Sequence, residues 1–153
     1  PVCSRVAAMT SVSDYAARSP RVPTDSEDLS LGDRNVRWFD TPHLPHSWES
    51  GLMMDLSTQT LFCGDLFTQG GRGDVALVSE DILGPSEAFR GAMDYFANSP
   101  HTGQMLERLA RQRPRTMACM HGSAWSGDGA NLLQGLRHAL AAGHDTARTA
   151  ERN

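Results

Sequence analysis

Hydrophobic residues in the first half of the chain predict one helix followed by three strands. Val6–Ala17 is rich in alanine and carries apolar residues at helical spacing, and Pro20 marks its end. Val36–Phe39 predicts a strand that stops at Asp40 and Pro42. Gly51–Leu56 and Thr60–Cys63 are two apolar runs joined by a polar turn, which predicts a β-hairpin.

The second half is predicted to be mostly helical. We expect one helix over Ser86–Ala97 with Ser86 as its N-cap, and another over Thr102–Arg113. Thr116–Met120 predicts a short strand, and a last helix follows the turn Gly127–Gly129. The buried faces of these helices are expected to contain Phe89, Met93, Phe96, Met105, Leu106, Leu109, Leu132, Leu133, Leu136 and Leu140. The methionines at positions 53, 54, 93, 105, 117 and 120 are all expected in the core.

Strands and helices in this order predict an α/β fold in which helices pack on a sheet. The chain has 153 residues, of which 39% are hydrophobic, and this is enough for one domain with its own core. We place that domain at residues 1–142 and expect the polar stretch 143–153 to be a frayed tail.

Charge and cysteine usage argue against several classes of function. A net charge of −4 does not favour a general nucleic-acid binder. No apolar run approaches the roughly 18 residues needed to cross a bilayer, and no basic-then-apolar leader is present, so we expect no membrane partner and no export. The three cysteines form no CxxC pair and are odd in number, which fits a reducing cytoplasm better than a disulfide framework.

Three polar residues stand where a predicted strand passes into a loop. His46 follows the strand that ends at Phe39, Asp65 follows the second strand of the hairpin, and His121 follows the strand at 116–120. Side chains at strand ends are held by the sheet and open to the loops, which suits a rigid site. Two imidazoles and a carboxylate suit zinc or iron. Taken singly, a histidine in a loop is also typical of the surface, and an aspartate after a strand is typical of an ordinary turn.

The segments around these residues resemble three successive motifs of the metallo-β-lactamase superfamily. They are Thr41–His46, Leu61–Phe67 and Met120–Ser123, in the superfamily's order, with a helical insertion between the second and third. The residue pattern is closest to that of the oxygen-binding di-iron subgroup found in flavodiiron proteins. In that subgroup, a loop histidine is followed by an aromatic residue and an acid. The resemblance covers roughly residues 1–142 and implies part of an αββα sandwich.

The resemblance implies a role for each residue that matches a motif. His46 would bind the first metal, Asp65 would bridge two metals, and His121 would bind the second. His43 stands three residues before His46, and the register of the motif makes it a loop residue or one that orients a ligand through a hydrogen bond.

Four further residues near these positions have two interpretations each. Trp48 and Glu49 would flank a substrate or gas pocket beside the metals, or the tryptophan would pin its loop to the core. Cys63 and Cys119 each stand two residues before a proposed ligand. We expect them to be small buried hydrophobes, with thiolate ligation or redox sensing as the minority alternative that alkylation would test.

The sequence departs from the superfamily at its first motif. The HxHxDH-like or HxExDH-like run, which supplies most remaining ligands, is not found here, and His101, His138 and His144 stand alone on or beside helices. We therefore expect the C-terminal half of the fold, with Pro1 at the boundary of a fragment rather than at a true mature terminus. Such a half should bind metal weakly or incompletely and be inactive alone.

Two classes of function follow for the intact protein. With two irons, it would bind and reduce dioxygen or nitric oxide, which needs electrons, and no flavodoxin-like segment is seen in this chain. With two zincs, it would activate water and hydrolyse a small-molecule ester, lactone or similar bond. The rival is a non-catalytic half-domain that acts as a scaffold, as a homo-oligomer or with a complementing N-terminal half.

Overall fold

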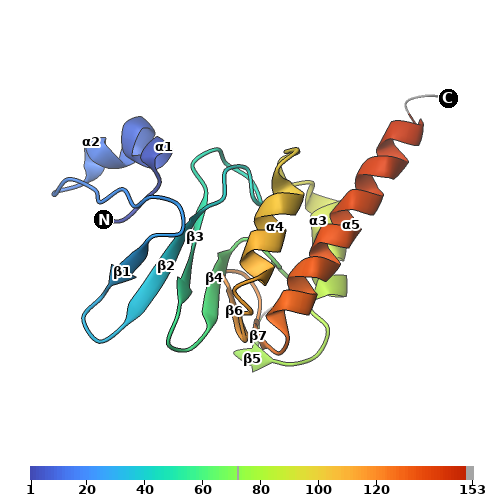
Figure 1. Ribbon diagram of the computed structural model, residues 1–153. Helices are drawn as coiled ribbons and strands as arrows, with labels where there is room; N and C mark the ends of the chain where they lie inside the picture. Colours follow the sequence, from blue (N-terminus) through green and yellow to red (C-terminus); the bar gives the residue numbers. More distant parts are fainter. Residues whose placement is uncertain (72, 151–153) are drawn as a thin grey trace.

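The computed structural model describes the backbone of residues 1–71 and 73–150, and the side chains of these residues up to position 142. The described strands form one sheet in the order β1-β2-β3-β4-β6-β7-β5, as Figure 1 shows. The strands are β1 (Asp28–Ser30), β2 (Asn35–Asp40), β3 (Gly51–Asp55), β4 (Thr60–Gly64), β5 (Leu77–Val78), β6 (Thr116–Cys119) and β7 (Ala124–Ser126). The sheet with its helices confirms the α/β prediction.

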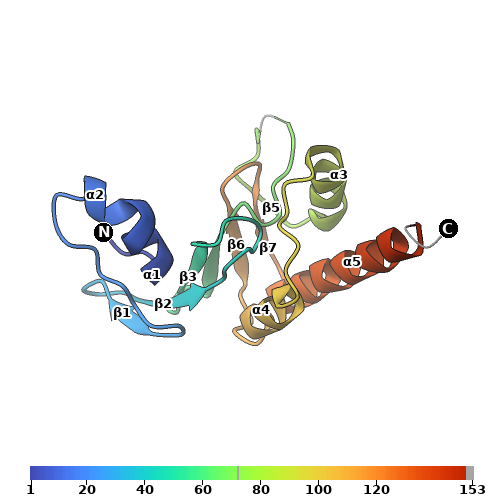
Figure 2. The same ribbon diagram turned by 90° about the horizontal axis from the view of Figure 1, so that it is seen from above.

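The helices lie at the two ends of the sequence and between β5 and β6. A continuous N-terminal helical segment consists of α1 (Arg5–Ala7), η1 (Ala8–Val12) and α2 (Ser13–Tyr15). The other helices are α3 (Leu83–Met93), α4 (Thr102–Ala110) and α5 (Gly129–Ala150). Figure 2 shows α4 and α5 side by side next to the sheet, while the N-terminal segment lies at the opposite end, beside β1.

The pairing of the strands explains how distant segments meet. Strands β1 to β4 form an antiparallel meander that includes the predicted β3–β4 hairpin. The chain then crosses over through α3 and α4 and returns in β6, which pairs with β4 in parallel. Two parallel strands need such a crossover, and their carboxyl ends then meet at the same edge of the sheet. The ends of β4 and β6 are therefore adjacent.

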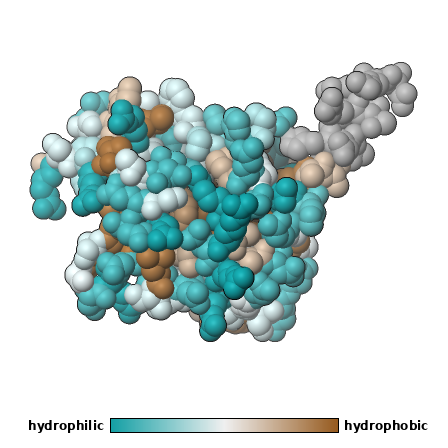
Figure 3. Space-filling view, viewed as in Figure 1, coloured by the Kyte–Doolittle hydropathy of each residue, from teal (hydrophilic) through white to brown (hydrophobic). Residues whose placement is uncertain are grey.

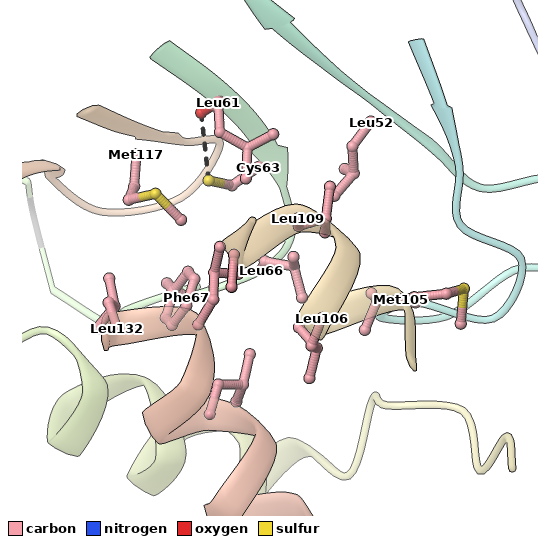
Figure 4. Close-up of a cluster of buried hydrophobic side chains, with 14 of the residues drawn as sticks. Leu52, Leu61, Cys63, Leu66, Phe67, Met105, Leu106, Leu109, Met117 and Leu132 are labelled. Atoms are coloured by element: carbon pink, nitrogen blue, oxygen red, sulfur yellow. Dashed lines mark hydrogen bonds between the residues drawn. The ribbon is translucent and has the colours of Figure 1, made fainter. Parts of the chain in front are cut away.

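One face of the sheet packs against α4 and α5 to form the main core. Strand residues such as Phe39, Leu61 and Met117 meet helix residues such as Leu109 and Leu133, and all five are almost fully buried. Figure 4 shows this cluster from close by, with Leu106 and Leu109 of α4 next to Leu66 and Phe67. These helical positions follow the spacing expected for a buried stripe, and the predicted inward faces of both helices are confirmed there.

The opposite face of the sheet carries a row of apolar residues across four strands. The register places Trp38 beside Met53, Met53 beside Phe62, and Phe62 beside Ala118. Trp38 is buried, because its ring lies over Gly51 where a Cβ atom would collide with it. Phe62 remains 48% exposed. Figure 3 shows that hydrophobic residues reach the surface in separate small groups on a largely hydrophilic face.

Three sequence expectations about the third helix and the methionines are wrong. Helix α3 begins at Leu83, where the Asp81 carboxylate accepts hydrogen bonds from the first backbone N–H groups, so the cap is not Ser86. Ser86 is buried inside the helix. The helix ends at Met93, before Phe96, and Met93 and Met120 are exposed rather than in the core.

The last helix is longer than the sequence predicts. Its polar end carries no apolar stripe, yet α5 continues past Gly143 to Ala150. The division of the chain at position 143 remains a prediction, and residues 151–153 of the predicted tail lie outside the described residues. Among the helices that the structure describes, none is both long and apolar enough to cross a membrane.

Candidate metal centre

His46 is held by the loop that connects β2 to β3. The backbone closes this loop through hydrogen bonds from Thr41 N–H to the Ser50 carbonyl and from His43 N–H to the Ser47 carbonyl. Leu44 is fully buried and anchors the loop to the core. The Nδ1 atom of His46 lies 3.0 Å from the Ser47 hydroxyl oxygen, which leaves Nε2 to face the end of β4.

Asp65 follows β4 directly, and its main chain is fixed by three donors. The backbone carbonyl of Asp65 accepts hydrogen bonds from the Thr68 N–H and hydroxyl, and from the hydroxyl of Tyr95 at 3.0 Å. Only 27% of the side chain is exposed. The Asp65 carboxylate therefore extends from a turn at the sheet edge that these hydrogen bonds hold in place.

His121 comes from the end of β6, which is the parallel neighbour of β4. The Met120 N–H donates to the Gly64 carbonyl and extends the pairing of the two strands beyond their formal ends. The Gln69 N–H then donates to the His121 carbonyl at 3.2 Å, so the loop after β4 also holds His121. The side chain of His121 is 60% exposed.

The structure brings the three predicted residues together around the Asp65 carboxylate. His46 Nε2 lies 2.7 Å from Asp65 Oδ2, and His121 Nε2 lies 3.4 Å from Asp65 Oδ1. Each imidazole therefore faces a different oxygen of one carboxylate. Oδ1 is buried and has no hydrogen-bond partner among the described residues. A buried carboxylate oxygen without a donor is costly, and a cation satisfies it well.

The three residues do not form a ready-made site for a single ion. Among the described residues, no group of three or more His, Cys, Asp or Glu side chains is placed to hold one ion. The three residues instead offer two positions, each with one imidazole nitrogen and one oxygen of Asp65. Imidazole and carboxylate donors suit zinc and iron alike, so the donor set fits a dinuclear centre of either metal.

A cleft of about 790 Å³ opens over the three residues. Its walls also include Thr68, Gln69, Gly70, Gly71, Gly73, Phe89, Tyr95, Met120 and Gly122. The ring of Tyr95 stands edge-on to His46, with 6.3 Å between ring centroids, and its burial raises the pKa of the Tyr95 hydroxyl. The cleft is large enough for a small molecule and places it against the imidazoles.

Comparison with known proteins supports the fold described above. No protein-family model matches the sequence. No curated protein matches it significantly. Among solved structures, the rubredoxin oxygen:oxidoreductase from the anaerobe Desulfovibrio gigas matches with a TM-score of 0.71 and 20% identity over 89% of this chain. The flavodiiron protein from Giardia intestinalis matches with a TM-score of 0.69 and 18% identity over 90%. The apo chemotaxis sensor ODP from T. denticola matches with 0.67 and 18% over 86%.

The chain has the fold of part of the metallo-β-lactamase-like region of the flavodiiron proteins. The resemblance inferred from the three motifs is thereby confirmed at the level of the fold. The chain covers 35%, 34% and 55% of the three matched chains, in the order given above, so it corresponds to only part of each of them.

Several predicted neighbours of the three candidate ligands lie apart from the cleft. His43 is exposed, and its side chain makes no hydrogen bond to a described residue. Trp48 is 59% exposed, so it neither lines the cleft nor pins the loop to the core. Glu49 is half-buried and contributes its carbonyl, which accepts from the Ser4 hydroxyl. His101 and His138 are exposed, and the side chain of His144 lies outside the described residues.

Sequence reasoning missed the aromatic wall of the cleft. Tyr95 lies just beyond α3, and it reaches Asp65 only because the crossover folds back over the sheet edge. No local sequence pattern predicts such a contact. Gln69 was missed as well, although it belongs to the glycine-rich loop that follows Asp65 and donates from its side chain to the Ser123 carbonyl.

The two cysteines beneath the site differ in environment. Cys63 is fully buried in the core, as expected, and burial raises the pKa of its thiol. Cys119 is partly exposed, and the neighbouring Cys63 thiol lowers the pKa of its thiol. The expectation that both are small buried hydrophobes therefore holds for Cys63 and only partly for Cys119.

Proposed function

We propose that the chain supplies His46, Asp65 and His121 to a dinuclear metal centre, most simply a di-iron centre that acts on dioxygen or nitric oxide. One observation carries the proposal. The Nε2 atoms of two histidines face different oxygens of a single carboxylate, and one of those oxygens has no hydrogen-bond partner among the described residues. His46 would bind the first ion, His121 the second, and Asp65 both.

Each residue has a physical reason to take this role. Two cations close together repel each other, and a carboxylate between them offsets that repulsion. The contact of His46 Nδ1 with the Ser47 hydroxyl orients the ring and leaves Nε2 free to bind. Tyr95 and Thr68 brace the backbone of Asp65 and so hold the bridging carboxylate in place.

The lining of the cleft supports a small ligand. Phe89, Tyr95 and Met120 give it apolar walls beside the two imidazoles. When bound, two irons would supply electrons to dioxygen or nitric oxide, whereas two zincs would supply an activated water to an ester or lactone. The matched structures favour iron, because the names of several of them state a di-iron protein.

Three ligands are too few to complete two metal sites. A zinc or iron ion usually takes four or more ligands, so further donors must come from outside this set. We propose that they come from a complementing N-terminal half or from a second chain that covers the sheet face with Phe62. Residues 1–142 would then be the C-terminal portion of one metallo-β-lactamase-like domain.

Metal loading and turnover can be measured on the same preparations. The protein is loaded anaerobically with Fe(II) or with Zn(II), and metal content and visible spectrum are recorded. Loaded samples then receive dioxygen, nitric oxide, or a chromogenic ester or lactone. We expect iron to bind weakly through the three residues, and we expect little or no consumption of dioxygen or nitric oxide until the missing donors are supplied.

Other outcomes separate the alternatives. Retention of zinc with ester or lactone hydrolysis would replace oxygen chemistry by hydrolysis on the same three residues. If neither metal is retained above the level of a His46→Ala variant, a non-catalytic module remains and the proposed centre is wrong. His101→Ala is the matched control, because that histidine is exposed and lies outside the cleft.

A further inference from the structure

Cys63 and Cys119 face each other across the parallel pair β4–β6. The register joins Phe62 to Ala118 and then Gly64 to Cys119, so it shifts by one residue at Cys63. Cys63 is therefore the extra residue of a bulge, and Cys63 and Gly64 together stand opposite Cys119.

The spacing of these two positions suits a disulfide bond. Neighbouring strands lie about 4.8 Å apart, and disulfides join Cα atoms separated by about 4.4 to 6.8 Å. Cys63 belongs to the main core, and Cys119 packs against the same core. Figure 4 shows the sulfur of Cys63 in the core, where its thiol donates a hydrogen bond to the Leu61 carbonyl at 3.3 Å.

The two sulfur atoms differ in their access to solvent. This difference determines which of them an oxidant from solvent meets first. Cys119 is partly exposed, so a small oxidant can reach its sulfur. Cys63 is completely buried, so a molecule from solvent cannot reach it first. The third cysteine, Cys3, belongs to a separate small cluster with Ala7 and Ala8 near the N-terminus. It is therefore not part of this pair.

We propose that Cys63 and Cys119 form a reversible intramolecular disulfide when the protein meets a hydroperoxide. The sulfur of Cys119 attacks the peroxide O–O bond, which gives a sulfenic acid and releases one water, for hydrogen peroxide. The sulfur of Cys63 then attacks the sulfenic sulfur, which forms the S–S bond and releases a second water. In total, two thiols lose two electrons and two protons, and one peroxide is reduced to two waters.

The disulfide would tie together the two strand ends that present the candidate metal centre. Asp65 is two residues beyond Cys63, and His121 is two residues beyond Cys119. A covalent link between β4 and β6 at this level fixes the spacing of the two turns that carry these residues. The chemistry of the thiol pair itself needs no metal, so it stands or falls separately from the proposed function.

The test is peroxide treatment of the folded, metal-free protein, followed by denaturation, alkylation and intact mass analysis. Reduced protein should take up three alkyl groups, one for each cysteine. Oxidised protein should take up one, carried by Cys3, and should weigh two hydrogen atoms less before alkylation. Peptide mapping should join the peptides of Cys63 and Cys119, and a thiol reductant should restore all three alkylation sites.

Two variants provide matched controls. In Cys63→Ser, Cys119 has no partner, so oxidation should stop at sulfenic or higher acids and the cross-linked product should disappear. In Cys3→Ser, the cross-link should form as in the unaltered protein. The proposal is overturned if the unaltered protein gains oxygen without losing two hydrogens, if the link joins Cys3, or if it joins two chains. The unaltered protein alone decides the proposal, so the proposal stays testable even if a variant fails to fold.

Discussion

The Nε2 atom of His46 lies 2.7 Å from Oδ2 of Asp65, although the two residues come from different loops and are separated by nineteen positions in sequence. The contact exists because the β2–β3 loop bends over the end of β4, where Asp65 leaves the sheet. His121 reaches the other oxygen of the same carboxylate from the end of β6. One aspartate thus lies between two histidines, and this arrangement has testable consequences for metal binding.

Loss of the Tyr95 hydroxyl should weaken metal binding without abolishing it. Its O–H donates to the Asp65 carbonyl and braces the turn that presents the carboxylate. Groups that orient ligands in this way are worth about 10- to 100-fold in metal affinity. We expect Tyr95→Phe to lower the affinity toward the bottom of that range, as measured by competition with a chromophoric chelator. Tyr15→Phe is the control, because Tyr15 is exposed far from the cleft, and an equal loss there would contradict the bracing role.

An added methyl group at Gly51 should destabilise the sheet. A Cβ atom at this position would collide with the ring of Trp38, which covers Gly51 on the second face of the sheet. Overpacking of this kind costs about 1–3 kcal/mol, so Gly51→Ala should lower the free energy of unfolding by that amount in urea. Gly91→Ala is the matched control, because nothing lies near its Cβ position on helix α3, and alanine should raise stability by about 0.5–1 kcal/mol. Equal effects at both glycines would show that Trp38 does not pack on Gly51.

Truncation of Leu109 should be among the most damaging changes in the core. Leu109 is fully buried where α4 meets the sheet, and Leu→Ala changes at such sites cost about 2–5 kcal/mol through lost burial and the cavity left behind. Thermal or urea unfolding of Leu109→Ala measures the loss. Leu31→Ala removes the same atoms from an exposed position and should change stability by less than about 0.5 kcal/mol. If the two variants unfold alike, α4 does not cover the core as described.

The Asp28–Arg37 pair predicts an acid-sensitive contact between β1 and β2. Hydrogen bonds from Arg37 lower the pKa of Asp28 below its usual value of 3.8. A lowered pKa means that the folded state favours the ionised carboxylate. Its contribution is therefore present above pH 3.8 and is lost as the pH falls through the lower value in the folded protein. Because the pair is half-exposed, we expect about 0.5 kcal/mol.

Urea unfolding at several pH values isolates this contribution. Asp28→Asn should lower stability at neutral pH, and its difference from the unaltered protein should shrink as the pH falls below 3.8. Asp33→Asn is the control, because Asp33 is exposed in the neighbouring turn and has no ion pair with a described residue. A difference for Asp28→Asn that stays constant with pH would mean that the ion pair does not contribute.

The sequence was sufficient for those parts of the fold that depend on local pattern. The β3–β4 hairpin follows from two apolar runs and a polar turn, and α4 and α5 follow from leucines at helical spacing. His46, Asp65 and His121 could be proposed as one set because each follows a strand and matches an ordered motif. Their convergence also requires β4 and β6 to be neighbours, which the sequence alone did not specify.

The parts that escaped prediction depend on long-range contacts or on very short elements. β5 has two residues and β7 has three, too few for any periodicity to appear, and they pair with each other across forty-seven positions of sequence. Met93 and Met120 were assigned to the core from their side chains, yet one ends an exposed helix and the other lines the cleft. Tyr95 reaches Asp65 only through the tertiary fold, so no pattern of neighbours could reveal it.

The most direct test of the central claim is a Co(II) titration followed by visible absorption, with metal content measured after desalting. Cobalt is a useful probe because its spectrum reports coordination by nitrogen and oxygen donors. We expect the unaltered protein to bind cobalt, His46→Ala and His121→Ala each to bind less, and Asp65→Asn to lose both ions together because it removes the shared carboxylate. Asp33→Asn is the control and should bind cobalt like the unaltered protein. If Asp65→Asn also binds cobalt to that extent, the two histidines do not share a metal centre through Asp65.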